Sequence, residues 1–285
     1  VKEIFPDVVF RECGPADIIR TARRSEDCHK GDNGRIMVIG GSESYAGAPV
    51  LSSLAGLRAG ADLVYLMSRP DVAWNANRIS PDLISIKGFH QFDKWKNRLD
   101  ALVIGPGLDE DTDISRFLSS GLPAVVDATG LKIISEDPGK YENMLNKTII
   151  TPHRGEFRRL CNSFSVNASN EEAVKFLAEK TGSVVVLKGK TDIISDGNLT
   201  RINTQGNPGM SVGGTGDILS GVIGALLGKT HDRYASACAG IFITTRAGDM
   251  AYEKYYYGLI SSDILEYIPA AIRESIEWKL GDVDG

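Results

Sequence analysis

One glycine-rich stretch, residues 203–227, constrains the fold of this chain more than any other segment. Apolar residues in its second half follow a helical spacing that buries one face. They are Ile218, Leu219, Val222, Ile223, Ala225 and Leu226. Glycines gather just before that helix, at Gly206, Gly209, Gly213, Gly214 and Gly216. Because glycine has no Cβ atom, it suits turns and close approaches of the backbone. The stretch therefore predicts a glycine loop that ends at the N-terminus of a buried helix.

This junction has the properties of an anion site. The first turn of a helix leaves backbone N–H groups without partners and carries partial positive charge, which attracts phosphate. Asp217 stands where the helix begins, and an ordinary N-cap is the alternative explanation for an acidic residue there. A cap needs only one residue, whereas Gly213, Gly214 and Gly216 would destabilise a simple connector through lost chain entropy. We therefore interpret the loop as a phosphate cradle with a carboxylate beside it.

Two common nucleotide-binding motifs are excluded. The triplet Gly228-Lys229-Thr230 resembles the end of a P-loop, but Ile223 occupies the position that requires glycine, and the triplet closes a helix. Gly105-Pro106-Gly107 lacks the third glycine of the Rossmann fingerprint. The expected phosphate site thus belongs to a different nucleotide-binding fold.

Composition excludes several other classes of protein. The net charge of −5 over 285 residues argues against a nucleic-acid surface, which needs clustered Lys and Arg. No apolar run reaches the length of a membrane span, and the first residues lack the apolar core of a signal peptide. The four cysteines form no Cys-x-x-Cys pair, so reduced thiols in a cytoplasmic protein are expected. Because the chain begins with Val1, we consider that it is a processed or excised piece of something longer.

From residue 35 onward, short β-branched runs alternate with helical segments, which predicts a mostly parallel sheet covered by helices on both faces. We expect strands at 35–39, 63–67, 83–86, 99–104, 124–127, 148–151 and 183–187, and an antiparallel hairpin over 192–203. Helices are expected at 48–59, 111–120, 155–160, 170–181, 232–254 and 262–278, with a capping box of Ser169 and Glu172. The first 30 residues read as irregular, with a short helix over 16–24. No linker divides the chain, so one domain over 1–285 is the prediction.

Distinctive residues follow the predicted strands. They are Gly40-Gly41-Ser42, Gly105-Pro106-Gly107, Asp127, Thr151-Pro152-His153 and Lys188-Gly189. Ligands of open α/β sheets bind beyond the carboxyl ends of the strands. The sequence therefore predicts one cleft at that edge.

These residues also carry a family resemblance. The segments 40–49, 105–108, 151–157 and 186–189, together with Asn207-Pro208-Gly209-Met210 and Gly213 to Asp217, resemble the ADP/ATP-dependent NAD(P)H-hydrate dehydratases of the ribokinase-like superfamily. The match covers about residues 30 to 250 in the family's order. The resemblance implies a ribokinase-like single domain that repairs NADH or NADPH hydrate. The hydroxyl on the hydrated nicotinamide ring is phosphorylated from ATP or ADP, and phosphate then leaves to restore the ring.

The resemblance also implies roles for particular residues. Asp217 matches the catalytic carboxylate, which would accept the hydroxyl proton while the N–H groups of Gly214, Thr215 and Gly216 meet the charge on the transferred phosphoryl group. The positions that match contacts with the hydrated dinucleotide are Ala48, Gly107, His153 and Asp217. Those that match contacts with ADP or ATP are Lys188, Gly189, Lys190, Thr191, Asp192 and Gly216. Considered without the family, His153 is more typical of a structural histidine. For Lys188, a solvated lysine at the end of a strand and a functional lysine are then equal alternatives. Glu156 is a candidate ligand for Mg²⁺.

One segment departs from the family pattern. Where the family often has a second acidic residue, this chain has Asp127-Ala128-Thr129-Gly130-Leu131, and Thr129 offers only a hydroxyl. We therefore assign no catalytic role around Asp127.

Two other functions stay open at this stage, and the family suggests further partners. One alternative is a kinase of the same fold that acts on a hydroxymethylpyrimidine, thiazole or pyridoxal-type alcohol; the other is a nucleotide sensor without turnover. The resemblance further implies small-molecule substrates only, a homo-oligomer, commonly a tetramer, and an upstream epimerase domain or partner.

Overall fold

The centre of the computed structural model, which describes residues 11–167 and 170–277, is one sheet with the strand order β3-β2-β1-β4-β5-β6-β7-β8-β9. The strands are β1 Arg35–Ile39, β2 Leu63–Ser68, β3 Ile84–Lys87, β4 Ala101–Ile104, β5 Ala124–Val126, β6 Thr148–Ile150, β7 Val184–Leu187, β8 Asp192–Ser195 and β9 Thr200–Asn203. All neighbouring pairs from β3 to β7 are parallel, whereas β8 pairs antiparallel with both β7 and β9. The predicted mostly parallel sheet and its hairpin are confirmed.

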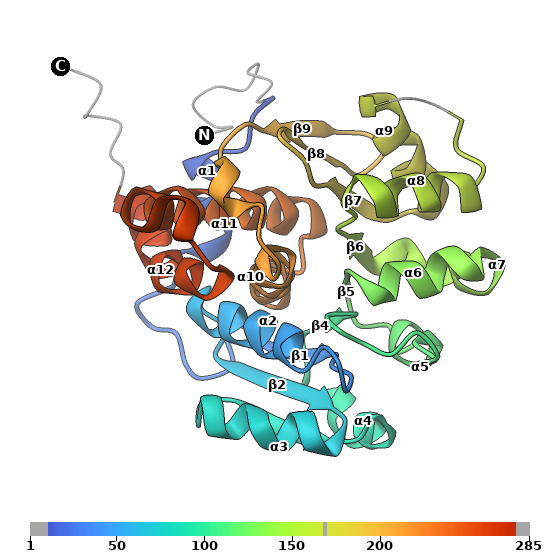
Figure 1. Ribbon diagram of the computed structural model, residues 1–285, viewed down its shortest axis with the longest axis horizontal. Coiled ribbons are helices and arrows are strands. Elements are labelled where there is room, and N and C mark those ends of the chain that lie inside the picture. Colours follow the sequence, from blue (N-terminus) through green and yellow to red (C-terminus); the bar gives the residue numbers. More distant parts are fainter. Residues whose placement is uncertain (1–10, 168–169, 278–285) are drawn as a thin grey trace.

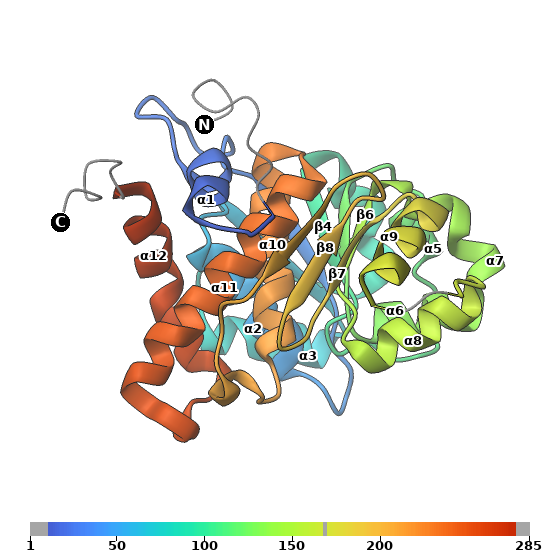
Figure 2. The ribbon, with the colours of Figure 1, turned by 90° about the horizontal axis from the view of Figure 1, so that it is seen from above.

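Helices cover both faces of this sheet (Figures 1 and 2). One layer contains α1 Pro15–Ala22, α2 Gly47–Arg58, α10 Thr215–Thr230, α11 Arg233–Tyr255 and α12 Ser261–Glu277. The opposite layer contains α5 Ser115–Leu118, α6 Thr129–Glu136, α7 Pro138–Tyr141, α8 Arg154–Ser163 and α9 Asn170–Thr181. Helices α3 Pro70–Ile79 and α4 Phe92–Trp95 lie near the β2–β3 end of the sheet. Short 3₁₀ turns are η1 Phe89–Gln91, η2 Lys96–Arg98, η3 Glu142–Lys147, η4 Pro208–Met210 and η5 Tyr256–Gly258.

Alternate residues of each central strand face the two layers. In β1, Ile36 and Val38 belong to the core under α2, α10 and α11, while Met37 and Ile39 belong to the core on the opposite face. All four side chains are fully buried. A strand buried on both faces reads as a continuous apolar run, which is why the sequence marks β1 and β4 so clearly.

Helix α10 lies at the centre of its layer and packs tightly against α2. A Cβ atom at Gly221 would lie 2.0 Å from the carbonyl oxygen of Ser52, so only glycine permits this approach. At the same crossing, the hydroxyls of Ser52 and of Ser220, the residue before Gly221, are 3.1 Å apart. The packing places the N-termini of the two helices side by side, with Leu51 of α2 against Gly214 at the start of α10.

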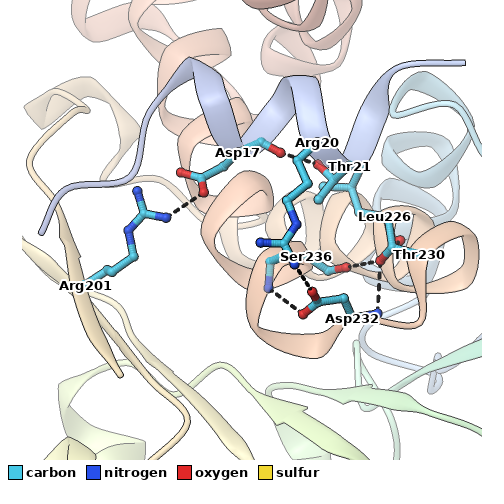
Figure 3. A network of polar contacts seen from close by, with 9 residues as sticks. Asp17, Arg20, Thr21, Arg201, Leu226, Thr230, Asp232 and Ser236 are labelled. Carbon is cyan, nitrogen blue, oxygen red and sulfur yellow. Dashed lines mark hydrogen bonds and ion pairs between the residues drawn. The ribbon is translucent and has the colours of Figure 1, made fainter. Parts of the chain in front are cut away.

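The N-terminal segment is more regular than the sequence predicted. Residues 11–13 add a short parallel bridge to β9 through Ile202, whose N–H donates to the carbonyl of Arg11. Asp17 in α1 pairs with Arg201 of β9, and Arg20 pairs with Asp232 before α11 (Figure 3). These contacts attach α1 to the body of the protein. The predicted short helix is present as α1, and an irregular stretch of turns follows it over residues 23–34.

Other predictions need correction. The helix expected over 111–120 is only the single turn α5, and α3 and α6 were not predicted. In α3, the residues Val72, Ala73 and Ala76 bury one narrow face, but the larger apolar side chains of Trp74 and Ile79 are exposed. The apolar residues therefore do not all mark the buried face, which obscures the helical pattern. Ser169 of the proposed capping box and residue 278 of the last predicted helix lie outside the described residues. That the domain extends over all of 1–285 stays a prediction.

None of the helices in the described part of the chain combines the length and apolarity that a bilayer span requires.

Candidate active site

A buried ion pair lies at the carboxyl ends of the central strands. The Nζ atom of Lys188, which follows β7, donates to Oδ1 of Asp127, which follows β5, at 2.8 Å. The Lys188 side chain is 21% exposed and that of Asp127 only 2%. Lys188 is therefore not a solvated strand-end lysine. Asp127 thus lies at the strand-end cleft, as the sequence predicted, even though Thr129 replaces the family's second acidic residue. The structure adds its ion pair with Lys188, which the sequence analysis did not foresee.

The charge on Lys188 is maintained by its neighbours. Burial alone would lower the pKa of this lysine, but attraction to Asp127, the hydrogen bond between them and the nearby carboxylates of Glu156 and Asp217 outweigh it. The pKa of Lys188 is consequently raised. The site thus contains a fixed positive charge between three acidic side chains.

Asp217 lies in the first turn of α10 and is not the N-cap. Gly214 occupies the cap position with φ of +97°, and no side chain caps this helix. Burial, and then the negative charge of Asp127, raise the pKa of Asp217 to about 7, while Lys188 acts in the opposite direction. The N-cap alternative is therefore wrong. A carboxyl group with this pKa is suited to exchange a proton near neutral pH.

The glycine cradle is formed by Gly214 and Gly216. A Cβ atom at Gly214 would lie 2.5 Å from Oγ of Ser261, and its positive φ disfavours other residues. At Gly216, a Cβ atom would lie 3.2 Å from Nζ of Lys188 and 3.4 Å from Oδ2 of Asp127, so a side chain here would crowd the ion pair. Between them, the hydroxyl of Thr215 donates to the carbonyl of Val212 and so stabilises the turn.

A cavity of about 480 Å³ opens beside this cradle. Most residues expected to contact ADP or ATP line it: Lys188, Gly189, Lys190, Asp192 and Gly216, with Thr215. The exception is Thr191, which is exposed and does not line the cavity. The opposite wall comes from the segment between β9 and α10, beginning at Thr204, and from α11. The sequence thus identified one wall of the cavity, and the fold supplies the other.

Asp192 shapes this cavity from within the protein. Its Oδ1 atom accepts the N–H of Gly189 at 2.9 Å, and its Oδ2 atom accepts Nδ2 of Asn203 at 2.9 Å. The carboxyl group is buried, and burial raises its pKa in spite of these hydrogen bonds. Asp192 therefore fixes the turn after β7 to strand β9.

Ala48 and Gly107 meet at a second place, near the N-terminus of α2. A Cβ atom at Gly107 would lie 3.2 Å from the Cβ of Ala48 and 2.5 Å from the carbonyl oxygen of Tyr45, and φ at Gly107 is +66°. Neither residue lines the cavity described above. Since α2 continues from Ala48 to Leu51, which contacts Gly214, this second place adjoins the cradle.

His153 and Glu156 begin helix α8. Nδ1 of His153 accepts the N–H groups of Gly155 and Glu156 at 2.9 and 3.3 Å, and Oε2 of Glu156 accepts the N–H of His153 at 2.9 Å. This reciprocal cap gives His153 the structural role that we weighed as the alternative. Its side chain is still 59% exposed, with Nε2 lying 3.6 Å from Oε2 of Glu156.

The electrostatic surroundings of Glu156 bear on the metal prediction. Burial raises the pKa of Glu156, and Lys188 partly opposes this rise. Among residues 11–167 and 170–277, no group of three or more His, Cys, Asp or Glu side chains is arranged to hold a metal ion. A metal bound by protein side chains alone is therefore not indicated in this part of the chain.

The mostly parallel sheet between two layers of helices is the ribokinase-like fold, which solved structures share. A ribokinase-like superfamily protein from Enterococcus faecalis has a similar structure, with a TM-score of 0.83 and 24% identity over 95% of this chain and 99% of that one. An ADP/ATP-dependent NAD(P)H-hydrate dehydratase from Bacillus subtilis, co-crystallised with ATP and Mg²⁺, gives a TM-score of 0.77 at 22% identity over 93% of this chain and 99% of the other.

The chain belongs to the NAD(P)H-hydrate dehydratase family, whose model matches residues 36–270. An ADP-dependent (S)-NAD(P)H-hydrate dehydratase from Cenarchaeum symbiosum is 36% identical over 88% of this chain and 92% of its own length. A bifunctional NAD(P)H-hydrate repair enzyme from Archaeoglobus fulgidus is 37% identical over 95% of this chain but only 58% of its own length. The chain thus spans little more than half of that relative. The resemblance inferred from the motifs is confirmed.

Proposed function

We propose that this chain dehydrates NADH or NADPH hydrate at the expense of ADP or ATP. The observation that carries the proposal is the position of Asp217, whose carboxyl group has a pKa of about 7 and lies in the first turn of α10 beside the glycine cradle. In this proposal the ionised carboxylate accepts the proton of the ring hydroxyl while the hydroxyl oxygen attacks the terminal phosphorus of the nucleotide. The bond from that phosphorus to the bridging oxygen breaks, which leaves AMP or ADP and a phosphorylated hydrate.

Loss of phosphate from this intermediate completes the reaction. The carbon–oxygen bond breaks, a proton leaves the neighbouring ring carbon, and the double bond of the reduced nicotinamide is restored. The N–H groups of Gly214, Thr215 and Gly216, together with the ammonium group of Lys188, would stabilise negative charge on the phosphoryl group during transfer. The nucleotide would occupy the cavity beside Lys188 to Asp192. The hydrated ring would approach from the side of Ala48, Gly107 and His153.

The residues fit a Mg²⁺ ion that is held mainly by phosphate. Magnesium in such sites typically takes one or two carboxylates, with phosphate oxygens and water as the other ligands. Glu156 is buried near Lys188 and Asp127, and its recorded hydrogen bond uses only Oε2. Glu156 would hold the ion. When bound, the ion would neutralise negative charge on the phosphates. Residues of the chain accomplish the proton transfer.

One assay separates this proposal from a small-molecule kinase of the same fold. Purified protein is incubated with NADH hydrate or NADPH hydrate, Mg²⁺ and either ADP or ATP. We expect recovery of the absorbance of reduced nicotinamide together with release of free phosphate. Comparison of the rates with ADP and with ATP identifies the better phosphoryl donor. A stable phosphorylated product without recovery of absorbance would support the kinase, and nucleotide binding without either product would support a sensor.

The proposal extends to assembly and context. We propose a cytoplasmic homo-oligomer, a tetramer by resemblance to the family, that works with an epimerase domain or partner. Support for a further domain comes from the greater length of the relatives named as bifunctional. Light scattering of the purified chain measures the assembly directly, and a monomeric mass would reject the oligomer.

A further inference from the structure

One wall of the cavity is formed by a loop that contains almost no regular secondary structure. We name residues 204–211 the pocket loop; all of them except Gly209 line the cavity. The loop connects β9 to the glycines before α10, and its residues 204–206 are exposed. Its only regular structure is the 3₁₀ turn η4. An exposed loop of this kind is mobile unless tertiary contacts hold it.

A carboxylate on helix α11 makes such contacts. Oδ1 of Asp249 accepts Nδ2 of Asn207 at 2.8 Å, and Oδ2 accepts the backbone N–H of Gly206 at 3.2 Å. Both carboxylate oxygens therefore bind the pocket loop. Gly206 has φ of +109°, a conformation that glycine adopts at little steric cost. Asp249 itself does not line the cavity formed by the described residues.

Steric contacts on the same helix fix the rest of the loop. A Cβ atom at Gly248 would lie 2.3 Å from Sδ of Met210, and one at Gly209 would lie 2.5 Å from the ring of Tyr252. Helix α11 thus presents a glycine to the Met210 side chain and an aromatic ring to Gly209. With Asp249, these contacts hold the loop at Gly206, Asn207, Gly209 and Met210.

We propose that Asp249 is a positioning residue that sets the affinity for ADP by holding the pocket loop in its binding shape. This inference rests on the proposed nucleotide site. The reason is preorganisation: a wall that is already ordered does not lose conformational entropy when the nucleotide binds. Asp249 acts through Gly206 and Asn207 and touches neither the nucleotide nor the reacting atoms.

The test measures ADP binding and loop order in the same variants. Asp249→Ala removes both acceptors, Asp249→Asn keeps one oxygen and the size of the side chain, and Glu253→Gln is the matched control. Glu253 lies one turn further along α11, is exposed and makes no recorded contact with the pocket loop. We expect Asp249→Ala to weaken ADP binding about tenfold by calorimetry, with a smaller loss in Asp249→Asn and none in Glu253→Gln.

Hydrogen exchange and kinetics complete the design. Without ADP, backbone amides of residues 204–211 should exchange faster in Asp249→Ala than in the wild type, whereas Glu253→Gln should exchange at the wild-type rate. At saturating ADP, the KM of Asp249→Ala for NADH hydrate should equal that of the wild type. An ADP affinity within about twofold of the wild type, or an equal loss in Glu253→Gln, overturns the inference. If Asp249→Ala does not fold, Asp249→Asn decides by the same two readouts. A wild-type protein that binds ADP but does not restore NADH contradicts the proposed dehydratase and leaves the role of Asp249 intact.

Discussion

Asp217 is the residue whose environment departs furthest from that of an ordinary acid. It is partly buried, it faces Asp127, and its carboxylate accepts no hydrogen bond recorded among the described residues. A carboxylate used only as a helix cap would instead accept backbone N–H groups, as Asp232 does from Ala235 at the start of α11. The contrast between these two aspartates separates a reactive position from a structural one.

Replacing the charge of Asp217 tests its proposed role as the proton acceptor. We expect Asp217→Asn to bind ADP normally and to lose turnover of NADH hydrate by about 10² or more, which is the usual range for a general base. Calorimetry with ADP measures the first effect and recovery of absorbance the second. Full activity in this variant would refute the assignment. Asp232→Asn, at a cap remote from the cavity, is the control for a lost carboxylate.

The pH dependence of turnover should follow the same group. With a pKa of about 7, Asp217 changes from mostly protonated to mostly ionised as the pH rises through neutrality, so turnover should rise through pH 7 on the acid side. The negative charge of Asp127 contributes to this raised pKa. Asp127→Asn should therefore move the acid limb of the profile to lower pH. An unchanged limb in that variant would show that Asp127 does not influence the proton acceptor.

Stability should respond to pH in the opposite direction. The native carboxyl of Asp217 keeps its proton up to about pH 7, whereas the unfolded chain releases it near pH 4. Between these values the native state binds the extra proton, so the contribution of Asp217 to stability falls as pH rises. Asp217→Asn should thus be more stable than the wild type at pH 8, by on the order of 1–2 kcal/mol after allowance for partial exposure, and the gap should shrink at pH 5. Denaturant unfolding at the two pH values measures this difference, and an equal gap at both would contradict it.

At the scale of elements, the site depends on how closely α10 packs against α2. The glycine at position 221 allows the helix to touch the backbone of Ser52, and this contact sets the two helix N-termini side by side. Alanine has the higher helix propensity, so an isolated α10 would favour Gly221→Ala. In the protein the clash should dominate, because the obstacle is a backbone carbonyl oxygen.

We therefore expect Gly221→Ala to lower the free energy of unfolding by about 1–3 kcal/mol. The matched control is Gly139→Ala in α7, where an added Cβ atom meets nothing within 4 Å. Thermal unfolding of the two variants gives the comparison. If Gly221→Ala kept the melting temperature of the wild type, α2 and α10 would be free to move apart.

At the scale of the whole molecule, helix α1 of the N-terminal segment is held by two ion pairs of different burial (Figure 3). The side chains of Asp17 and Arg201 are 11% and 16% exposed, whereas those of Arg20 and Asp232 are 69% and 38% exposed. Removing one member of a shielded pair leaves a charge without compensation, while an exposed pair contributes little.

Asp17→Asn should consequently cost about 2–3 kcal/mol of unfolding free energy, and Arg20→Gln less than about 1 kcal/mol. Chemical denaturation of both variants measures the costs. Similar small losses in the two would indicate that α1 is not anchored through β9.

Much of the site could be predicted because its residues stand at the ends of apolar runs. Lys188 and the glycines around Asp217 were found in this way, and their convergence follows from the shared edge of parallel strands. Asp127 was visible at such an end as well, but comparison with the family pattern at Thr129 led us to discount it. The pocket loop and Asp249 could not be found, since a hydrogen bond between residues about forty positions apart leaves no local pattern.

The sequence by itself determined the alternation of strands and helices, the glycine cradle and the family, because periodicity and motif spacing are local properties of the chain. Only the tertiary structure decided which charges surround Asp217, that His153 caps a helix, and that α11 holds the far wall of the cavity. These features arise from burial and from contacts between distant segments, and such contacts exist only once the chain has folded.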